Sequence, residues 1–95
     1  MSSSTGLVDR SDTDARLRAI LSDVLGLDPS KVVHFAATTG LFGHIPELDS
    51  MAVAGLFTEM EDRLGFVIED DEVDAELLET YGALLAFAEA KRART

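Results

Sequence analysis

A serine preceded by an aspartate, Asp49-Ser50, stands at the start of a segment whose apolar residues recur with helical spacing. These apolar residues are Val53, Leu56, Phe57, Met60 and Leu64. At the start of such a helix the first backbone N–H groups are free, and with the helix dipole they favour a bound phosphate. A serine hydroxyl presented to solvent there is therefore suited to carry a phosphodiester.

The same pair has a plainer interpretation. Asp and Ser are preferred N-cap residues, and their side chains satisfy the first N–H groups of a helix without taking part in any chemistry. Taken alone, Asp49-Ser50 therefore indicates where a helix begins. The rest of the chain has to decide whether the hydroxyl of Ser50 is used.

Other residue types that do chemistry form no convincing site. His34 and His44 lie in one long predicted loop, without further ligands in a fixed frame for a metal ion, and nothing positions either ring on Ser50. The acidic run over residues 69–79 lacks the alternating Asp/Asn positions and central glycine of an EF-hand loop. We expect no metal site and no catalytic centre, and a hydrolase nucleophile at Ser50 would lack both a base and an oxyanion frame.

Length and composition restrict the class of protein. The chain has 95 residues, enough for a single domain, and no cysteine, so any thiol chemistry needs a thiol supplied from outside. No apolar run approaches the roughly 20 residues that cross a bilayer. We expect a cytoplasmic protein without stable membrane insertion.

The charge is strongly acidic and unevenly placed. Eighteen acidic residues against eight basic ones give a formal net charge of -10, which disfavours binding to nucleic acids and favours a monomer. Between Glu47 and Glu79 there are twelve acids and one base, Arg63. Such a surface attracts partners with Lys/Arg patches, although it could also serve only to keep the protein soluble.

Periodicity and turn residues predict a small four-helix bundle. We expect a mobile N-terminal arm over residues 1–10 and a helical domain over residues 11–93. The first predicted helix covers about residues 12–25 and ends at Gly26, and a turn at 28–30 and a long loop to Asp49 follow it. The second long helix covers residues 50–64 and ends at Gly65, and an extended segment follows at 66–68. A short third helix runs from the acids at 69–72 to about residue 78, and Thr80 caps the last helix.

The long loop must be held down by its own apolar residues, because connections of this length are unusual in a compact domain. The residues available to pack over the helices are Val32, Val33, Phe35, Leu41, Phe42, Ile45 and Leu48. The first three could also begin a strand, but no second strand is evident to pair with it. Gly55 within the second long helix costs about 1 kcal/mol relative to alanine, which indicates close approach by a neighbouring helix or by a partner.

The order of these features resembles that of an acyl carrier protein. The likeness covers about residues 12–92, nearly the whole domain. It depends on Asp49-Ser50-Met51 at the start of a helix, Glu61-Asp62 toward its end, Phe66-Val67-Ile68 before an acidic third helix, and Thr80 at the start of the last. The resemblance implies an all-α, four-helix bundle of acyl-carrier-protein type, with a long loop between helices one and two and a short third helix.

The resemblance also implies a cofactor and a role. In that family the serine of an Asp-Ser-Leu motif carries 4′-phosphopantetheine, added from coenzyme A by a magnesium-dependent phosphopantetheinyl transferase. Ser50 matches that serine, Asp49 matches the preceding aspartate, and Met51 replaces the usual leucine. The protein would then hold acyl groups as thioesters and catalyse nothing itself.

The implied partners are the phosphopantetheinyl transferase, an acyl-loading ligase or synthase, and acyltransferases with basic patches. The residues expected to dock them are Met51, Glu59, Glu61, Asp62, Asp70 and Asp71. The residues expected to line a shelter for the acyl chain are Phe57, Met60, Leu64, Ile68 and Leu85.

The sequence departs from the family pattern in the first turns of the second long helix, where acids are frequent but Ala52 and Gly55 stand here. This departure argues against service to a general fatty-acid synthase. The string over residues 43–53 is more similar to carriers found beside bacterial exosortase and exopolysaccharide systems. An aminoacyl or peptidyl carrier, or an unmodified acidic module that binds a basic protein, are the alternatives.

Overall fold

The computed structural model describes residues 10–94, and within this range the chain is helical without a β-strand. Its elements are α1 (Arg10–Leu25), α2 (Pro29–Val32), α3 (Ser50–Leu64), the single 3-10 turn η1 (Asp70–Glu72) and α4 (Tyr81–Ala93). The predicted all-α bundle is therefore confirmed. The arm predicted over residues 1–10 lies outside the described residues, apart from Arg10, which is the first residue of α1.

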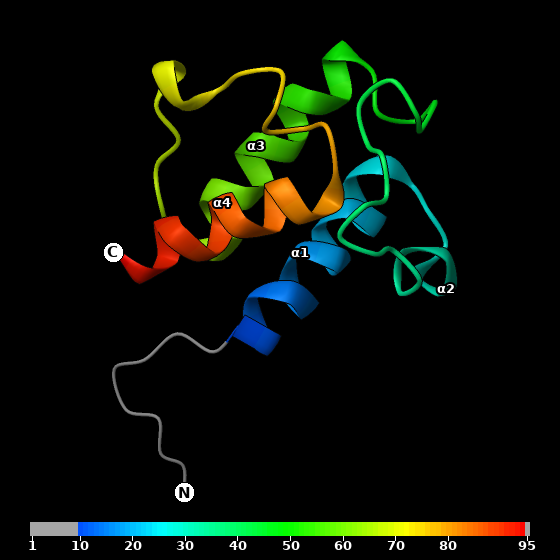
Figure 1. Cartoon of the computed structure of the whole chain (residues 1–95), viewed down its shortest axis with the longest axis horizontal. Coiled ribbons are helices and arrows are strands. Elements are labelled where there is room, and N and C mark those ends of the chain that lie inside the picture. The colour runs from blue at the N-terminus through cyan, green and yellow to red at the C-terminus, as the bar shows by residue number, and fades with distance from the viewer. Residues whose placement is uncertain (1–9, 95) are drawn as a thin grey trace, which may run out of the picture.

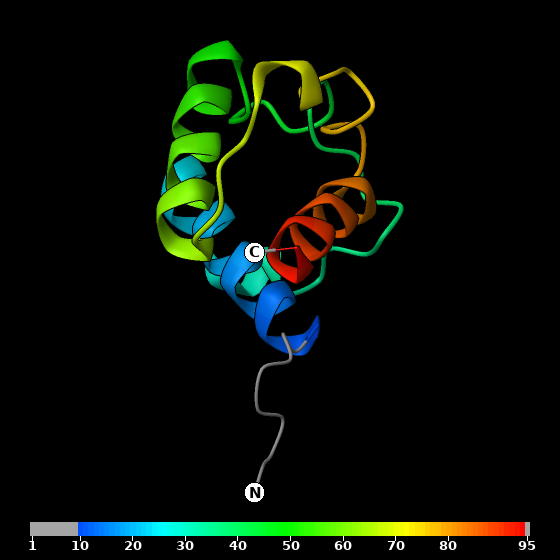
Figure 2. The same cartoon turned by 90° about the vertical axis from the view of Figure 1, so that its left-hand side faces the viewer.

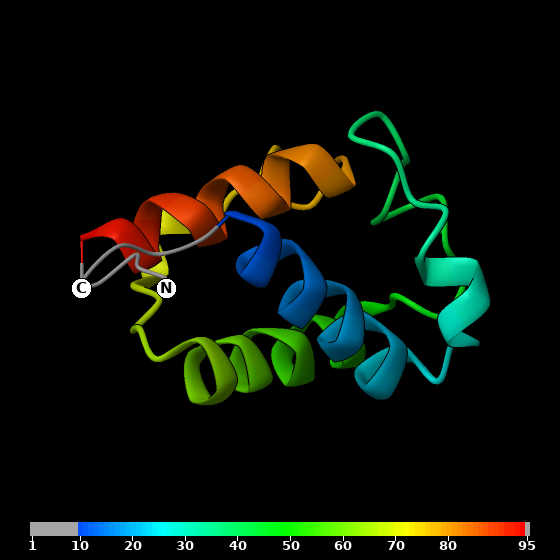
Figure 3. The ribbon, with the colours of Figure 1, turned by 90° about the horizontal axis from the view of Figure 1, so that it is seen from below.

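Helix α1 is the centre of the molecule and contacts α2, α3 and α4 (Figure 1). In the view of Figure 2, α3 and α4 stand on opposite sides, and the segment between them, residues 66–80, passes across the top. Seen from below, α1 runs between α3 and α4, and α2 lies beyond one end of the bundle (Figure 3). The segment that precedes α3 and the segment that precedes α4 thus meet at the same end.

The core forms where the apolar stripes of the three long helices face each other. From α1 it takes Leu17, Ile20 and Leu21, all with no exposed surface. The fully buried residues of the other two helices are Leu56 and Met60 of α3 and Tyr81, Leu84 and Ala88 of α4. The predicted apolar face of the first helix is therefore confirmed.

The ends of the long helices follow their local sequence. Gly65 adopts the left-handed conformation after α3, with φ of 77°, and its N–H donates to the carbonyl of Glu61 at 3.0 Å. Thr80 caps α4, because its hydroxyl accepts from the N–H of Ala83 at 3.1 Å. Both boundaries agree with the prediction.

The prediction that residues 28–30 form only a turn is wrong, because a short helix, α2, begins there. Asp28 caps α2 and accepts from the N–H of Ser30 at 2.9 Å, and Pro29 occupies the first helical position, where its missing N–H costs nothing. Val32 therefore ends a helix and begins no strand.

The predicted short third helix is also wrong in form. Only the turn η1 is helical, and Val73 after it has extended backbone, with φ of -90° and ψ of 116°. Residues 74–79 then form backbone hydrogen bonds between residues three apart. The N–H of Leu77, for example, donates to the carbonyl of Asp74 at 3.2 Å, and the Asp74 carboxylate accepts from the same N–H at 2.9 Å. Side chains that bond to the backbone in this way compete with α-helix formation.

The long loop is tied to the residues that precede α4 by backbone hydrogen bonds. Gly40 and Thr80 form an isolated antiparallel bridge, flanked by bonds from Leu41 N–H to the carbonyl of Glu79 at 3.1 Å and from Phe42 N–H to that of Leu78 at 2.9 Å. Of the seven apolar loop residues expected to pack, five are buried and two are exposed. The buried ones are Val32, Phe35, Leu41, Ile45 and Leu48, and the exposed ones are Val33 and Phe42.

A polar joint connects α1, α2 and α4. The hydroxyl of Tyr81 donates to the Asp14 carboxylate at 2.5 Å, and Arg18 lies 4.6 Å from the centre of the Tyr81 ring while donating to Asp14 at 2.9 Å and to the carbonyl of Val32 at 2.7 Å. Burial and the bond to Asp14 raise the pKa of Tyr81 well above its usual range. Burial acts to raise the pKa of Asp14, but the bonds from Arg18 and Tyr81 outweigh it and lower that pKa.

Two glycines inside helices allow a matched test of packing. A Cβ at Gly55 would lie 3.7 Å from a methyl group of Val24, an ordinary contact, so no neighbouring helix approaches Gly55 closely. A Cβ at Gly82 would lie 2.8 Å from the carbonyl oxygen of Ala37, which Gly82 N–H already binds at 2.9 Å.

We expect Gly55→Ala to raise the free energy of unfolding by about 0.5–1 kcal/mol, because alanine loses less backbone entropy. Gly82→Ala should lower it by about 1–3 kcal/mol, because the backbone around Ala37 must move. Urea denaturation of both variants measures the two changes. Equal effects of the two substitutions would contradict the packing described for both helices.

Candidate functional site

Ser50 is the first residue of α3, and its side chain is exposed. Within residues 10–94 its hydroxyl makes no hydrogen bond, and the N–H groups of Ser50 and Met51 have no acceptor. Free donors of this kind at a helix N-terminus favour an anion. The hydroxyl is therefore accessible and lies where a phosphodiester would be stabilised.

Asp49 holds this end of the helix in place. Its carboxylate accepts from the N–H of Ala52 at 2.8 Å, and its carbonyl accepts from Val53 at 3.0 Å. The plain N-cap interpretation of the Asp-Ser pair therefore holds for Asp49 and not for Ser50. Asp49 positions the serine and leaves its oxygen free.

Two hollows meet at Ser50. One, of about 280 Å³, lies between α3 and the segment before α4, with Phe42, Val53 and Leu78 among its walls. The other, of about 360 Å³, lies along the loop before α3, where its walls include His44 and Asp49. A tether attached at Ser50 would start at the edge of both.

These walls were largely missed by reasoning from the sequence. Phe42 was expected to pack into the core, but 47% of its surface is exposed and it lines both hollows. Asp74, Ala75 and Leu78 reach the smaller hollow because the bonds between the loop and residues 78–82 bring the two segments together. Only this pairing of distant segments could have identified them, and no local pattern predicts it.

The predicted docking residues differ in their surroundings. Met51 is 85% exposed and Asp62, Asp70 and Asp71 are exposed, so all four are accessible to a partner. Glu61 instead accepts from the N–H of Ile68 at 2.8 Å and fastens the segment after α3 to the helix.

Glu59 is half-buried, and its carboxylate lies 3.8 Å from the guanidinium of Arg63. The turn η1, which carries Asp70 and Asp71, is anchored by an ion pair of 2.8 Å between Lys91 and Glu72. That bond, together with one from the Glu69 N–H, lowers the pKa of Glu72.

The predicted acyl-shelter residues all belong to the core or border it. Met60 and Leu64 are buried, and Phe57, Ile68 and Leu85 are half-buried against the core. None of these five lines either hollow beside Ser50.

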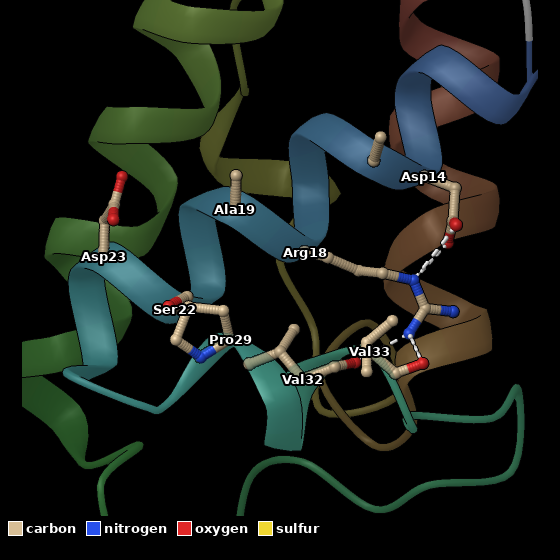
Figure 4. Close-up of a pocket in the computed structure, with 9 residues that line it drawn as sticks. Asp14, Arg18, Ala19, Ser22, Asp23, Pro29, Val32 and Val33 are labelled. Carbon is tan, nitrogen blue, oxygen red and sulfur yellow. Dashed lines mark hydrogen bonds and ion pairs between the residues drawn. The ribbon is translucent and has the colours of Figure 1, made fainter.

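A larger hollow of about 570 Å³ lies between α1 and α2 and does not include Ser50 (Figure 4). Its walls include Ala19, Pro29 and Val33, and Arg18 reaches along one side to Asp14 and to the carbonyls of the α2 end. This hollow is part of the polar joint between the helices.

Two further features concern metal ions and membranes. Among residues 10–94 no three His, Cys, Asp or Glu side chains come together in a way that could hold a metal ion. In that same part of the chain no helix combines the length and apolar character needed to span a bilayer.

Comparison with known proteins agrees with this geometry. Residues 15–88 match the family model described as a phosphopantetheine attachment site. Among solved structures, a holo acyl carrier protein from Nitrosomonas europaea, determined by solution NMR, is similar to the chain. The two are 43% identical over 83% of this chain and 93% of that one, with a TM-score of 0.74. No curated protein gives a significant match.

The family model covers most of the domain, and the structural match extends over nearly the whole of the related protein. The all-helical fold, with an exposed serine at the start of α3, is common to the expectation from sequence and to the structure. Carriers of this family are generally not catalysts. The chain therefore belongs to the acyl carrier protein family and is a phosphopantetheine-bearing carrier of acyl groups.

Proposed function

We propose that Ser50 is the residue to which 4′-phosphopantetheine is attached, and that the chain is a substrate of a phosphopantetheinyl transferase. The observation that carries this proposal is the exposed, unbonded hydroxyl at the first position of α3. In the transfer, the Ser50 oxygen forms a bond to the phosphorus that joins the pantetheine part of coenzyme A to its nucleotide. The bond to the leaving nucleotide phosphate breaks, and the serine proton passes to a base of the transferase.

The residues of this chain fit that group. The free N–H donors of Ser50 and Met51 face the side on which a phosphodiester would sit, and the two hollows give the first atoms of the arm somewhere to lie. When attached, the arm supplies a terminal thiol, the group that a chain without cysteine lacks. An acyl group bound to that thiol is a thioester, whose carbonyl is reactive toward a nucleophile of the partner.

An intact-mass measurement tests this function. Apo protein incubated with coenzyme A, Mg²⁺ and a broad-specificity phosphopantetheinyl transferase should gain the mass of one phosphopantetheine group per chain. A protein that stays at its apo mass, while a known carrier in the same tube is loaded, would contradict the proposal.

We also propose that the acyl chain enters through the smaller hollow and is sheltered by the residues behind it. Val53 and Leu78 form the apolar walls of the hollow beside Ser50. Met60 and Leu64 of α3 lie farther along the same helix and are buried in the core. The remaining shelter residues are the half-buried Phe57, Ile68 and Leu85.

The docking surface that we propose is the exposed face formed by Met51, Asp62 and the residues of η1. The accessible side chains on it are Met51, Asp62, Asp70 and Asp71, with Glu59 at the edge. Its partners are the phosphopantetheinyl transferase, an acyl-loading ligase or synthase, and acyltransferases, each with a basic patch. Such contacts between charged surfaces are fast and sensitive to salt. Glu61 contributes by holding residues 65–68 against α3.

The double variant Asp62→Asn/Asp70→Asn tests this surface. We expect it to weaken binding to the transferase about 3- to 10-fold at low salt, because each exposed charge pair is worth about 0.2–1 kcal/mol. Isothermal calorimetry at low and high salt measures the loss, which should shrink as salt rises.

The matched control is Ala15→Lys/Ala86→Lys, which changes the net charge by the same two units at exposed positions of α1 and α4. It should bind nearly as the unmodified sequence does. Equal weakening by both double variants would mean that the partner senses only total charge and that no docking surface exists at α3 and η1.

A further inference from the structure

His44 is a basic side chain that lines the same hollow as the proposed attachment site. It lies in the turn that follows the bridge at Gly40, and with Ser50 and Asp49 it lines the hollow of about 360 Å³. None of the other residues that line either hollow beside Ser50 can carry a positive charge. The other histidine, His34, lies next to the end of α2 and lines neither hollow.

The His44 ring is held in a defined place. A Cβ added at Gly40 would collide with the Cγ and Cδ2 atoms of the ring, so the imidazole stands directly over the Gly40 backbone. The N–H of His44 donates to the carbonyl of Leu41 at 2.9 Å, and Gly43 before it has a φ of 87°, in the left-handed region. The turn therefore fixes the backbone of His44, and the ring lies over Gly40.

The ring nitrogens are free to act on a ligand. Within residues 10–94 neither nitrogen of His44 has a hydrogen-bond partner, and the side chain is exposed. A histidine in this state can donate an N–H to an anion.

The charges around this hollow are otherwise negative. Asp49 faces it, with one carboxylate oxygen bound to the N–H of Ala52, and Glu47 stands in the same loop. Asp74 lines the neighbouring hollow. A phosphodiester attached to Ser50 adds a further negative charge to this group, so a cation beside it would be strongly favoured.

We propose that His44 is a positioning residue for the phosphodiester on Ser50. Its imidazole donates an N–H to a non-bridging phosphate oxygen and holds the phosphate end of the phosphopantetheine arm in the hollow along residues 42–50. The inference rests on the proposed attachment at Ser50. The ligand that His44 recognises is a phosphodiester monoanion. The histidine takes no part in transferring the arm, which is the task of the partner enzyme.

NMR comparison of the apo and holo forms of the full chain tests this inference. The ring signals of His44 should shift on loading, because a ring N–H then donates to a phosphate oxygen. His34 serves as the internal control, and its ring signals should be the same in both forms.

Two variants separate a specific contact from a general charge effect. His44→Gln should load fully and move the ³¹P signal of the holo protein. Gly40→Ala should displace the ring and reduce the loading-dependent shift of the His44 ring signals while loading continues. A holo protein with complete loading at Ser50 and unchanged His44 ring signals would overturn the inference and leave the proposed function intact. Absence of loading would overturn both.

Discussion

Ser50→Ala is expected to abolish the uptake of phosphopantetheine, with no mass increase after incubation with coenzyme A and transferase. The reason is that the transferred phosphorus needs an oxygen nucleophile, and Ser50 offers an exposed one without a competing partner among residues 10–94. Because the side chain packs against nothing, the thermal midpoint should change little, in line with about 0.5 kcal/mol or less for exposed surface positions. Intact-mass spectrometry and circular dichroism measure the two effects.

Ser30→Ala is the matched control. Ser30 is also exposed, and it also lies in the first turn of a helix that an aspartate caps. Its hydroxyl, however, donates to Asp28 at 2.9 Å, and α2 has only four residues. This variant should load as the unmodified sequence does. Loading of Ser50→Ala, or failure of Ser30→Ala alone, would show that the arm is attached elsewhere.

Tyr81→Ala is expected to lower the free energy of unfolding by about 3–5 kcal/mol, the range seen when a large buried aromatic residue is truncated. Tyr81 is 1% exposed, and its ring lies 6.1 Å from that of Phe35, so its loss opens a cavity where the long loop meets α4. It also removes the ring beneath Arg18 and the donor to Asp14. Urea denaturation at pH 7 measures the loss.

Tyr81→Phe divides this effect into packing and hydrogen bonding. Keeping the ring and removing the hydroxyl should cost about 1–2 kcal/mol, because the partly buried Asp14 loses one donor but retains Arg18. The half-buried Leu85, in the same helix, gives a control through Leu85→Ala, which should cost less than Tyr81→Ala. Equal losses for Tyr81→Phe and Tyr81→Ala would contradict the role assigned to the aromatic ring.

The parts of the fold that depend on local signals could be predicted from the sequence. The start of α3 at Ser50 and its end at Gly65, and the cap of α4 by Thr80, follow from residues next to each boundary. The accessibility of Ser50 follows in the same way, since Asp49 alone satisfies the N–H of Ala52. The proposed attachment site is thus encoded almost entirely within a few consecutive residues.

The features that depend on distant contacts could not be predicted. Phe42 reads as a core residue, and it lines the site because its N–H is bound to the carbonyl of Leu78. The sequence gives Glu61 the pattern of an exposed acidic residue, but its carboxylate accepts from the N–H of Ile68. The spacing of acidic residues along the helix does not predict this hydrogen bond. The predicted third helix is reduced to η1, because Asp74 bonds to the backbone three residues ahead and Val73 is extended. Here a local side chain competes for the backbone, whereas for Phe42 and Glu61 a contact with another segment decides the role of the residue.

The most direct test of the central claim is tandem mass spectrometry of peptides from the protein purified from its native cells. The peptide that contains Asp49-Ser50-Met51 should carry phosphopantetheine on the serine, and a fraction of the arms should bear an acyl group as a thioester that hydroxylamine removes. A peptide that is unmodified in every molecule, or an arm found on a different serine or threonine, would contradict the account.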